Sequence, residues 1–278
     1  MTTTLRPAGP LQRATDGTTS RAYDVCVNSR PVGAVELGTM PGFGPGAGAI
    51  RSLRIDEADR GRGRGTVAAL AAEEVLRGWG CDQVLVSVPV EAAVGLRMTA
   101  SLGYRERSRN MVKRLGAGPA PVTDVVLRRM TPEEFDSWEA ASREGFAQSW
   151  IDRGVPVEQA RAKAEASTRE NLPDGLATEG AGLHVAVRDG TVVGHLWTGR
   201  RELTPGEQSA FVYDIDVVEE QRGKGYGRAL MLLAERTARD SGARLLGLHV
   251  FTGNTPAIRL YESLGYATTH VNSFKPLL

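Results

Sequence analysis

The sequence predicts an α/β fold in which a mixed β-sheet is flanked by helices, and three observations support this prediction. Strand-like and helix-like segments alternate along residues 124–278. A glycine-rich turn joins a strand to a helix at two places in the chain. Both turns also belong to an internal repeat, so we expect two related domains.

All the matches between the two copies of the repeat have the same spacing along the sequence. Residues 60–65 (RGRGRG) match residues 222–227 (RGKGYG), and residues 102–104 (LGY) match residues 264–266 (LGY), in both cases 162 positions later. Two further pairs have the same spacing: Asn110 with Asn272, and Lys113 with Lys275. We therefore divide the chain into a first domain at residues 1–116, a linker of small residues and prolines at residues 117–123, and a second domain at residues 124–278.

The second domain begins with a strand and two helices. Residues 124–130 alternate between apolar and polar side chains, which predicts a strand. Thr131, followed by Pro132 and two glutamates, is typical of a helix start. Helical segments are then expected at residues 132–154 and 156–171.

The rest of the second domain continues with a hairpin. Asp189-Gly190 is a two-residue turn signal between strands 183–188 and 192–198. The later elements follow from apolar periodicity and terminal glycines, in this order: strand 210–218, helix 225–241, strand 244–251, helix 255–263 and strand 267–274. Only 22 residues precede the matching hairpin of the first domain at residues 23–38, so that domain lacks room for both early helices.

The composition is that of an ordinary globular protein, with 41% hydrophobic residues, 24% charged residues and a net charge of +1. This balance does not favour a nucleic-acid or anionic-membrane surface, and no run approaches the ~18 apolar residues that a membrane helix needs. The only cysteines are Cys26 and Cys81, which argues against a disulfide framework or a cysteine-based metal site. Because the N-terminal residues also lack the apolar core of a signal peptide, we expect a cytoplasmic protein without a metal.

The turn at residues 222–227 follows a predicted strand and precedes a predicted helix. Glycines there let backbone N–H groups approach an anion closely, and the helix N-terminus adds positive partial charge. The expected ligand is a phosphate or pyrophosphate. Two other phosphate motifs do not fit, because Gly225 follows Lys224 where a Walker A loop needs Ser or Thr, and Arg228 replaces the third glycine of a dinucleotide-binding loop.

Two runs resemble the signatures of the GNAT acyltransferase superfamily. Residues 215–227 (IDVVEEQRGKGYG) are similar to its acyl-CoA motif, with Glu219 where the family often has proline. Residues 254–266 (NTPAIRLYESLGY) are similar to its second signature, N-x-x-A-x-x-L-Y-x-x-x-G-[FY]. The resemblance covers residues 124–278 and, in reduced form, residues 23–115. It implies two tandem GNAT-like domains, the first one truncated, and an N-acetyltransferase that uses acetyl-CoA.

The resemblance also implies roles for individual residues. The main chain of Val217 and Val218 would pair with the pantetheine arm, the N–H of Val217 would face the thioester oxygen, and Asn254 would hydrogen-bond the pantetheine. Tyr261 would be the general acid that protonates the departing CoA thiolate. Backbone amides of the glycine turn would hold the CoA pyrophosphate: Arg222, Gly223, Lys224, Gly225, Tyr226, Gly227 and Arg228.

Several groups are candidates for the general base, and the sequence does not decide between them. His249 is placed first because it lies on the strand beside the thioester, where some protein N-terminal acetyltransferases of the superfamily have a similar Leu-His-Val run. Asp214 and Asp216 on the central strand are the next candidates, with an ion pair to an arginine as their alternative role, and water-relayed transfer completes the set. Strand alternation directs both aspartates to one face and Tyr213 to the other. The two hairpin histidines are interpreted as structural: His184 and His195.

The first domain keeps the glycine turn but not the second signature. At the spacing of 162 residues, Tyr261 corresponds to Thr99 and Asn254 to Ala92. A threonine cannot replace a phenol as the proton donor to a thiolate. We therefore expect a degenerate domain that either binds CoA without turnover or only supports the second domain.

The predicted function is transfer of an acetyl or similar acyl group from acetyl-CoA to a primary amine of a small molecule or peptide, by direct attack on the thioester. Two alternatives remain: a GNAT-fold transferase with an aminoacyl-tRNA or carrier-protein donor, and a non-catalytic acyl-CoA-binding protein. No nucleic-acid or membrane partner is expected. The chain would be a monomer with an intramolecular pseudo-dimer, or a homodimer.

Overall fold

A computed structural model describes residues 2–116, 124–152 and 155–277, so the predicted linker at residues 117–123 lies outside the described residues. The chain forms two compact units. Unit 1 contains the residues up to Ser108, together with Val155 and the residues from His270 onward, and unit 2 contains the remainder. No helix in the described part of the chain is long and apolar enough to cross a membrane.

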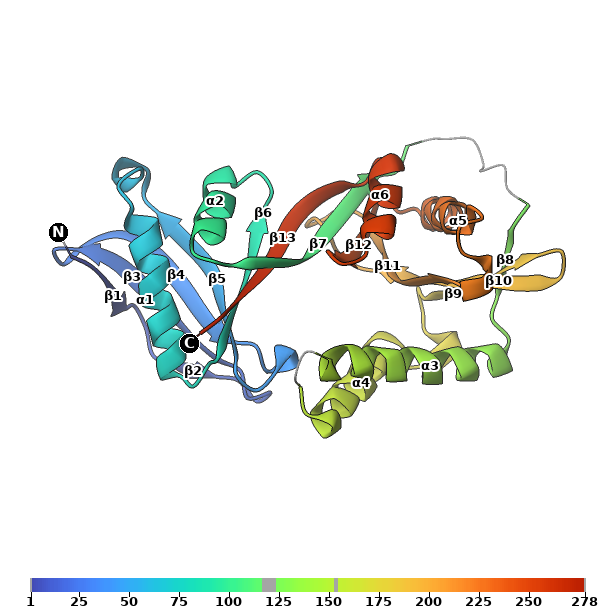
Figure 1. Cartoon of the computed structure of the whole chain (residues 1–278), viewed down its shortest axis with the longest axis horizontal. Helices are drawn as coiled ribbons and strands as arrows, with labels where there is room; N and C mark the ends of the chain where they lie inside the picture. Colours follow the sequence, from blue (N-terminus) through green and yellow to red (C-terminus); the bar gives the residue numbers. More distant parts are fainter. Residues whose placement is uncertain (1, 117–123, 153–154, 278) are drawn as a thin grey trace. The chain divides into compact units, whose positions relative to one another are not determined.

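Unit 1 is a sheet with the strand order β1-β3-β4-β5-β6-β13, and β2 pairs with β3 (Figure 1). Its helices are α1 (Arg64–Gly78) and α2 (Ala93–Ser101), with short 3-10 turns at η1 (Pro41–Phe43) and η2 (Glu57–Asp59). Its strands are β1 (Thr3–Pro7), β2 (Gln12–Arg13), β3 (Thr19–Val27), β4 (Arg30–Thr39), β5 (Ala47–Ile55), β6 (Gln83–Pro89) and β13 (Ala267–Pro276). Among its described residues no α-helix precedes β3, as expected for a truncated copy.

Unit 2 has the strand order β7-β12-β11-β10-β9-β8. Its strands are β7 (Arg105–Arg114), β8 (Val126–Arg129), β9 (Gly182–Arg188), β10 (Thr191–Arg200), β11 (Ser209–Val217) and β12 (Leu245–Phe251). Its helices are α3 (Pro132–Ile151), α4 (Val157–Asn171), α5 (Tyr226–Asp240) and α6 (Thr255–Ser263), with η3 (Gly175–Ala177) and η4 (Glu219–Gln221). The predicted α/β class and the predicted order of elements are confirmed, with ends shifted by a few residues.

Local chemistry explains several of these boundaries. The Thr131 side chain accepts a hydrogen bond from the Glu134 amide at 3.3 Å, and the Glu134 carboxylate accepts one from the Thr131 amide at 2.9 Å. This reciprocal pair is a capping box, and Pro132 occupies the first helical position. At the hairpin, Asp189 and Gly190 both have positive φ, which suits the tight turn that their sequence predicts.

Each unit takes one strand from the other repeat, which the sequence does not reveal. β13 ends the second repeat but pairs antiparallel with β6 in unit 1, from His270 opposite Pro89 to Pro276 opposite Gln83. β7 ends the first repeat but is the neighbour of β12. The residues of unit 1 and unit 2 are therefore not the two repeats taken whole.

Matched ion pairs accompany the two exchanged strands. Lys275 Nζ lies 2.7 Å from Glu73 on α1, and Lys113 Nζ lies 2.7 Å from Glu235 on α5. Both glutamates are almost fully buried. The two lysines, which occupy equivalent repeat positions, thus make equivalent contacts in opposite units.

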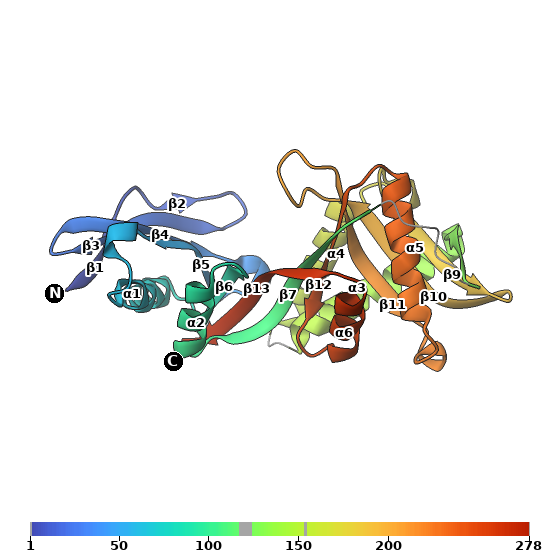
Figure 2. The same cartoon turned by 90° about the horizontal axis from the view of Figure 1, so that it is seen from above.

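In unit 2, α5 lies on one face of the sheet and α3 on the other (Figure 2), and each face has its own core. On one face α5 packs through Leu230, Met231 and Ala234 against residues such as Leu196 and Val212. On the other face α3 contributes a smaller cluster with the strands: Phe135, Trp138, Leu183 and Val185. Trp197 packs against this second cluster, so the face covered by α3 is rich in aromatic side chains.

A β-bulge changes which side chains share that face. Trp197 of β10 is opposite Asp214, but the next residue, Thr198, is opposite Val212, so Tyr213 is an extra residue in β11. Tyr213 stacks on Trp197 with ring centroids 4.7 Å apart. The two aspartates share one face, as expected, but the expectation that Tyr213 points to the opposite face is wrong, because simple alternation does not continue through a bulge.

Candidate active site

The two central strands of unit 2 separate and leave a cavity between them. β11 and β12 are parallel, and their pairing runs from Ser209 opposite Leu245 only as far as Val212 opposite Leu248. Beyond this point the strands share a cavity lined by the following residues: Val212, Tyr213, Asp214, Ile215, Leu248, His249, Val250, Phe251, Asn254 and Tyr261. The cavity thus collects the predicted acid, the first-placed base and the predicted pantetheine contact.

The glycine turn has the backbone that an anion site needs. Gly223 and Gly225 have φ values of 77° and 87°, which a residue with a side chain adopts only under strain. The hydrogen-bond ladder of α5 begins with the amides of Arg228 and Ala229, both bonded to the Gly225 carbonyl. The amides of residues 223–227 therefore precede the ladder, at the positive end of the helix dipole.

The end of β11 beside this turn is held by side chains. The Val218 amide donates to the Val193 carbonyl at 3.0 Å, so alternation directs the Val217 amide to the opposite edge, toward β12. Arg222 Nε donates to the Val217 carbonyl at 3.0 Å, and its guanidinium also lies 3.3 Å from Asp216. Asp216, predicted as a candidate base, is thus exposed and paired with an arginine.

Tyr261 is buried on α6 and borders the cavity. Burial raises the pKa of Tyr261 to about 12, with a further contribution from the negative charge of Asp214. Its phenol therefore keeps its proton across the neutral and mildly basic range. Asn254 caps the same helix, because its side-chain oxygen accepts a hydrogen bond from the Ala257 amide at 3.2 Å.

His249 also borders the cavity, from β12. Its side chain is exposed, and its ring meets that of Phe251 edge-on with centroids 5.0 Å apart. The predicted acid and the predicted first base therefore line the same cavity from α6 and β12.

A polar network that sequence reasoning missed lies on the aromatic face. Asp214 Oδ2 lies 2.9 Å from His195 Nε2 and accepts a second hydrogen bond from Trp138 Nε1 at 3.1 Å. Burial alone would raise the pKa of Asp214, but these hydrogen bonds outweigh it and hold the pKa below its ordinary value. Asp214 is therefore a carboxylate that connects a histidine to the cavity bordered by Tyr261.

His195 borders a second cavity, between the hairpin strands and α3. Its lining residues are Met130, Glu133, Glu134, Ser137, Trp138, Val185, Val192, Gly194, His195 and Val218. The ring of Trp138 meets that of His195 at 6.1 Å and that of Trp197 at 5.5 Å, both edge-on. No sequence motif marks His195, since its partner is 19 residues away and its second neighbour lies on α3.

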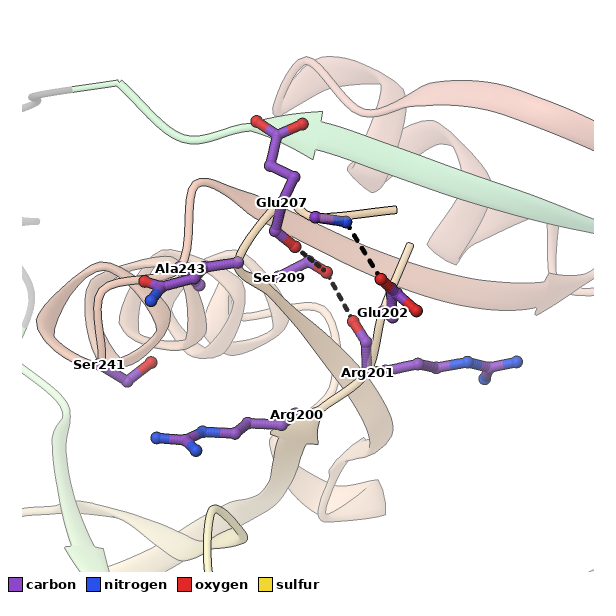
Figure 3. A pocket seen from close by; sticks show the side chains of 9 residues that line it. Arg200, Arg201, Glu202, Glu207, Ser209, Ser241 and Ala243 are labelled. Carbon is purple, nitrogen blue, oxygen red and sulfur yellow. Dashed lines mark hydrogen bonds between the residues drawn. The ribbon is translucent and has the colours of Figure 1, made fainter. Parts of the chain in front are cut away.

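A different hollow lies at the start of β11 (Figure 3). Ser209 Oγ donates to the Arg201 carbonyl at 2.6 Å, and the Gly206 amide donates to Glu202 at 3.1 Å, so these bonds order the connection from β10. The predicted site residues lie at the other end of β11, so this hollow is not part of the candidate site. Among the described residues, no group of three or more His, Cys, Asp or Glu could hold a metal ion.

Comparison with known proteins finds that this chain is similar to acetyltransferases. An uncharacterized N-acetyltransferase, YdgE of Bacillus subtilis, is 33% identical over 153 residues, which are 54% of this chain and 97% of that protein. A mycothiol acetyltransferase of Thermomonospora curvata is 30% identical over 253 residues, covering 86% of this chain and 79% of that one. A solved tandem GNAT protein from the clavulanic acid biosynthesis pathway shares the fold, with a TM-score of 0.53 at 20% identity, over 95% of this chain and 85% of that one.

The family model described as the acetyltransferase (GNAT) family matches two regions, residues 5–104 and 134–266. These regions correspond to the two repeats, so the tandem organisation is confirmed. With both regions matched, the chain belongs to the GNAT acetyltransferase family.

Proposed function

We propose that the second repeat transfers the acetyl group of acetyl-CoA to a primary amine of a small molecule or peptide, by direct attack on the thioester. The observation that carries the proposal is the cavity between β11 and β12, which Tyr261, Asn254 and Asp214 border together. The names of the similar proteins, N-acetyltransferase and mycothiol acetyltransferase, also support transfer of an acetyl group.

The donor would be held by main-chain groups. The amides of the turn from Arg222 to Arg228 would bind the pyrophosphate, and the Val217 amide would stabilise the negative oxygen that forms on the thioester carbon. The pantetheine would pair with the edge of β11 and displace Arg222 from the Val217 carbonyl. Tyr261 would then give its proton to the departing sulfur.

Donor binding and amine-dependent release of free CoA thiol test this proposal. The wild-type protein is incubated with acetyl-CoA and a panel of primary amines, and thiol release is followed together with CoA affinity by calorimetry. An aminoacyl-tRNA or carrier-protein donor, or a protein that binds acyl-CoA without catalysis, predicts no amine-dependent thiol release. That result would overturn the proposal.

The two glycine turns offer a matched pair of variants. Gly225→Ala forces a side chain onto a φ of 87° and should weaken CoA binding about tenfold or more, since misplaced amides lose several hydrogen bonds to the pyrophosphate. Gly63→Ala places the same strain, at a φ of 70°, in the turn of the first repeat. Turnover should remain close to wild type in Gly63→Ala. Equal loss in both variants would contradict the assignment of catalysis to the second repeat.

A further inference from the structure

We propose that His195 is the general base for the acceptor amine, and that Asp214 positions its imidazole ring. The inference rests on the proposed function and deepens it, because it names the group that prepares the acceptor for attack. It gives a chemical role to a histidine for which the sequence indicated a structural one, in place of the first-placed candidate His249. The donor contacts and the role of Tyr261 are unchanged.

One hydrogen bond decides which ring nitrogen of His195 is basic. His195 Nε2 lies 2.9 Å from Asp214 Oδ2. An ionised carboxylate only accepts hydrogen bonds, so the Nε2 atom of a neutral His195 carries the proton and donates it. The lone pair is then on Nδ1. Within the described part of the chain, no hydrogen bond involves Nδ1, so this nitrogen is available to take a proton.

Asp214 is itself a poor base in this arrangement. Burial opposes its ionisation, but hydrogen bonds from His195, the Trp138 indole and the Ile215 backbone outweigh burial and hold its pKa below the ordinary value. Donors that stabilise a carboxylate lower its affinity for a proton, whereas an imidazole has an ordinary pKa of about 6.5. Asp214 is therefore a positioning residue, which fixes the tautomer of the ring and stabilises the imidazolium that forms.

The strand register places His195 beside the proposed thioester carbonyl. His195 of β10 is directly opposite Asp216 of β11, the residue before Val217, whose amide is the proposed oxyanion donor. Opposite residues of antiparallel strands have Cα atoms about 5 Å apart. The bond from Trp138 of α3 to Asp214 shows that this polar network lies on the face covered by α3. An amine that approaches the thioester from that face meets His195 directly or through one water.

The cavity beside His195 suits the acceptor. It is the second cavity, between the hairpin strands and α3, and it extends to Val218 at the end of β11. Its volume of about 420 Å³ is enough for a small amine or one residue of a peptide. The carboxylate of Glu133 and the indole of Trp138 are part of its lining, and both attract a cation.

The proton count balances with His195 as the base. The alkylammonium first gives one proton to Nδ1, and the freed lone pair of the amine forms the new C–N bond. The C–S bond breaks with its electron pair going to sulfur, and Tyr261 gives its proton to that sulfur. The second proton of the nitrogen replaces the one that Tyr261 lost. The imidazolium releases its proton to water, since the side chain is 26% exposed. The sum is N-alkylacetamide, CoA thiol and H⁺.

The other carboxylates around His195 already have partners. On α3, a hydrogen-bonded arginine of β8 lowers the pKa of Glu134 to about 2. A hydrogen bond to its own backbone amide lowers the pKa of Glu133. Both glutamates therefore stay ionised near neutral pH, where an imidazole gains and loses its proton. On β11, Asp216 lies 3.3 Å from the guanidinium of Arg222.

The test is the pH dependence of kcat/KM for an alkylamine that the wild-type protein acetylates, from pH 6 to pH 10.5 at saturating acetyl-CoA. The wild-type value should rise with deprotonation of an imidazole and level off before the pKa of the amine. In His195→Gln only amine that is already neutral reacts, so kcat/KM should fall about 100-fold near pH 7 and climb until the pH reaches the pKa of the amine. Asp214→Asn donates to Nε2 and favours the wrong tautomer, so it should lose about as much.

Matched controls separate this inference from the proposed function. CoA affinity should be unchanged in His195→Gln, because the donor contacts are elsewhere. His184→Gln replaces the histidine of the neighbouring strand β9, which has no bond to Asp214 among the described residues, and should keep the wild-type profile. If the wild type acetylates amines and His195→Gln keeps the same profile within twofold, His195 is not the base and the proposed function stands. If His249→Gln instead removes the rise near neutral pH, the base lies on β12 and the inference is overturned.

Nitrogen-15 NMR of the histidine rings tests the tautomer in the wild-type protein, without a variant of His195. The ring signals are assigned by replacing the other three histidines one at a time. At pH 8 the His195 ring should carry its proton on Nε2, with Nδ1 unprotonated. A proton on Nδ1 at this pH would overturn the inference, because that nitrogen would have no lone pair for the ammonium proton.

Discussion

The two repeats share a strand–turn–helix framework but differ at most of the positions that the proposed chemistry uses. Both have a glycine turn with positive φ, at Gly63 and at Gly225. Both have a β-bulge on the central strand. In β5 the extra residue is Arg51, because Glu36 is opposite Ser52 and Leu37 is opposite Ile50. In β11 the extra residue is Tyr213. The framework that we propose to hold the donor therefore occurs in both repeats.

The side chains of Tyr261 and of the Asp214, His195 and Trp138 network have no counterparts in the described part of the first repeat. The pairing registers place Ser52 where the second repeat has Asp214, and Ala34 where it has His195. Thr99 stands in place of Tyr261 and donates to the Leu96 carbonyl of its own helix at 3.0 Å. No helix corresponding to α3, which supplies Trp138, is found among the described residues of the first repeat. The comparison teaches that the strand–turn–helix framework can be present without the polar side chains that line the cavity of the second repeat.

The largest expected effect is loss of the phenol in the repeat that we propose to be active. Tyr261→Phe removes the proton donor and should lower kcat about 10²- to 10⁴-fold while leaving CoA affinity nearly unchanged. Because the pKa of Tyr261 is raised to about 12 and the protonated form is the active one, the wild-type rate should not fall through ionisation of this group below about pH 11. Steady-state kinetics from pH 6 to pH 10.5 measure both.

Thr99→Val is the matched control at the equivalent position of the first repeat. It removes a hydroxyl bonded within its own helix and should leave kcat within twofold of wild type. A comparable loss of activity in Thr99→Val would break the comparison, because it would give the first repeat a part in turnover.

Sequence patterns predicted the positions of the helices and strands well, but they did not predict which strands pair with one another. Glycines, the capping box after Thr131 and apolar periodicity are local signals, so they located nearly every helix and strand of unit 2. The exchange of strands is not local. β7 and β13 carry the same asparagine and lysine at equivalent positions, so no pattern says which sheet each strand joins. Long-range pairing decides it, through equivalent contacts to Glu73 and Glu235.

The candidate site likewise has one part that the sequence predicted and one part that it did not. The predicted acid and donor residues lie in two contiguous motifs, at residues 215–227 and 254–266, and the structure brings them to one cavity. The Asp214–His195 pair could not be predicted, because it depends on a bulge at Tyr213 and on a helix 76 residues before Asp214. Side chains from three elements meet there, and a single sequence has no periodicity that encodes such a meeting.

The next largest expected effect is a loss of stability when the lysine of an exchanged strand is replaced. Lys113→Met leaves the buried Glu235 carboxylate unpaired and should destabilise unit 2 by about 3–5 kcal/mol, although Lys113 belongs to the first repeat. Lys275→Met should destabilise unit 1 by a similar amount through Glu73. Hydrogen exchange should therefore speed up in α5 for the first variant and in α1 for the second. The opposite assignment would contradict the exchange of strands.

The smallest expected effect concerns a helix that only the second repeat has. Thr131→Ala removes one half of the capping box of α3 and should cost about 1 kcal/mol, or roughly 2–4 °C in Tm. Thr131→Ser keeps the hydroxyl and should restore most of the loss. A Tm equal to that of the wild type, with wild-type kinetics, would mean that packing against the sheet holds α3 without its cap.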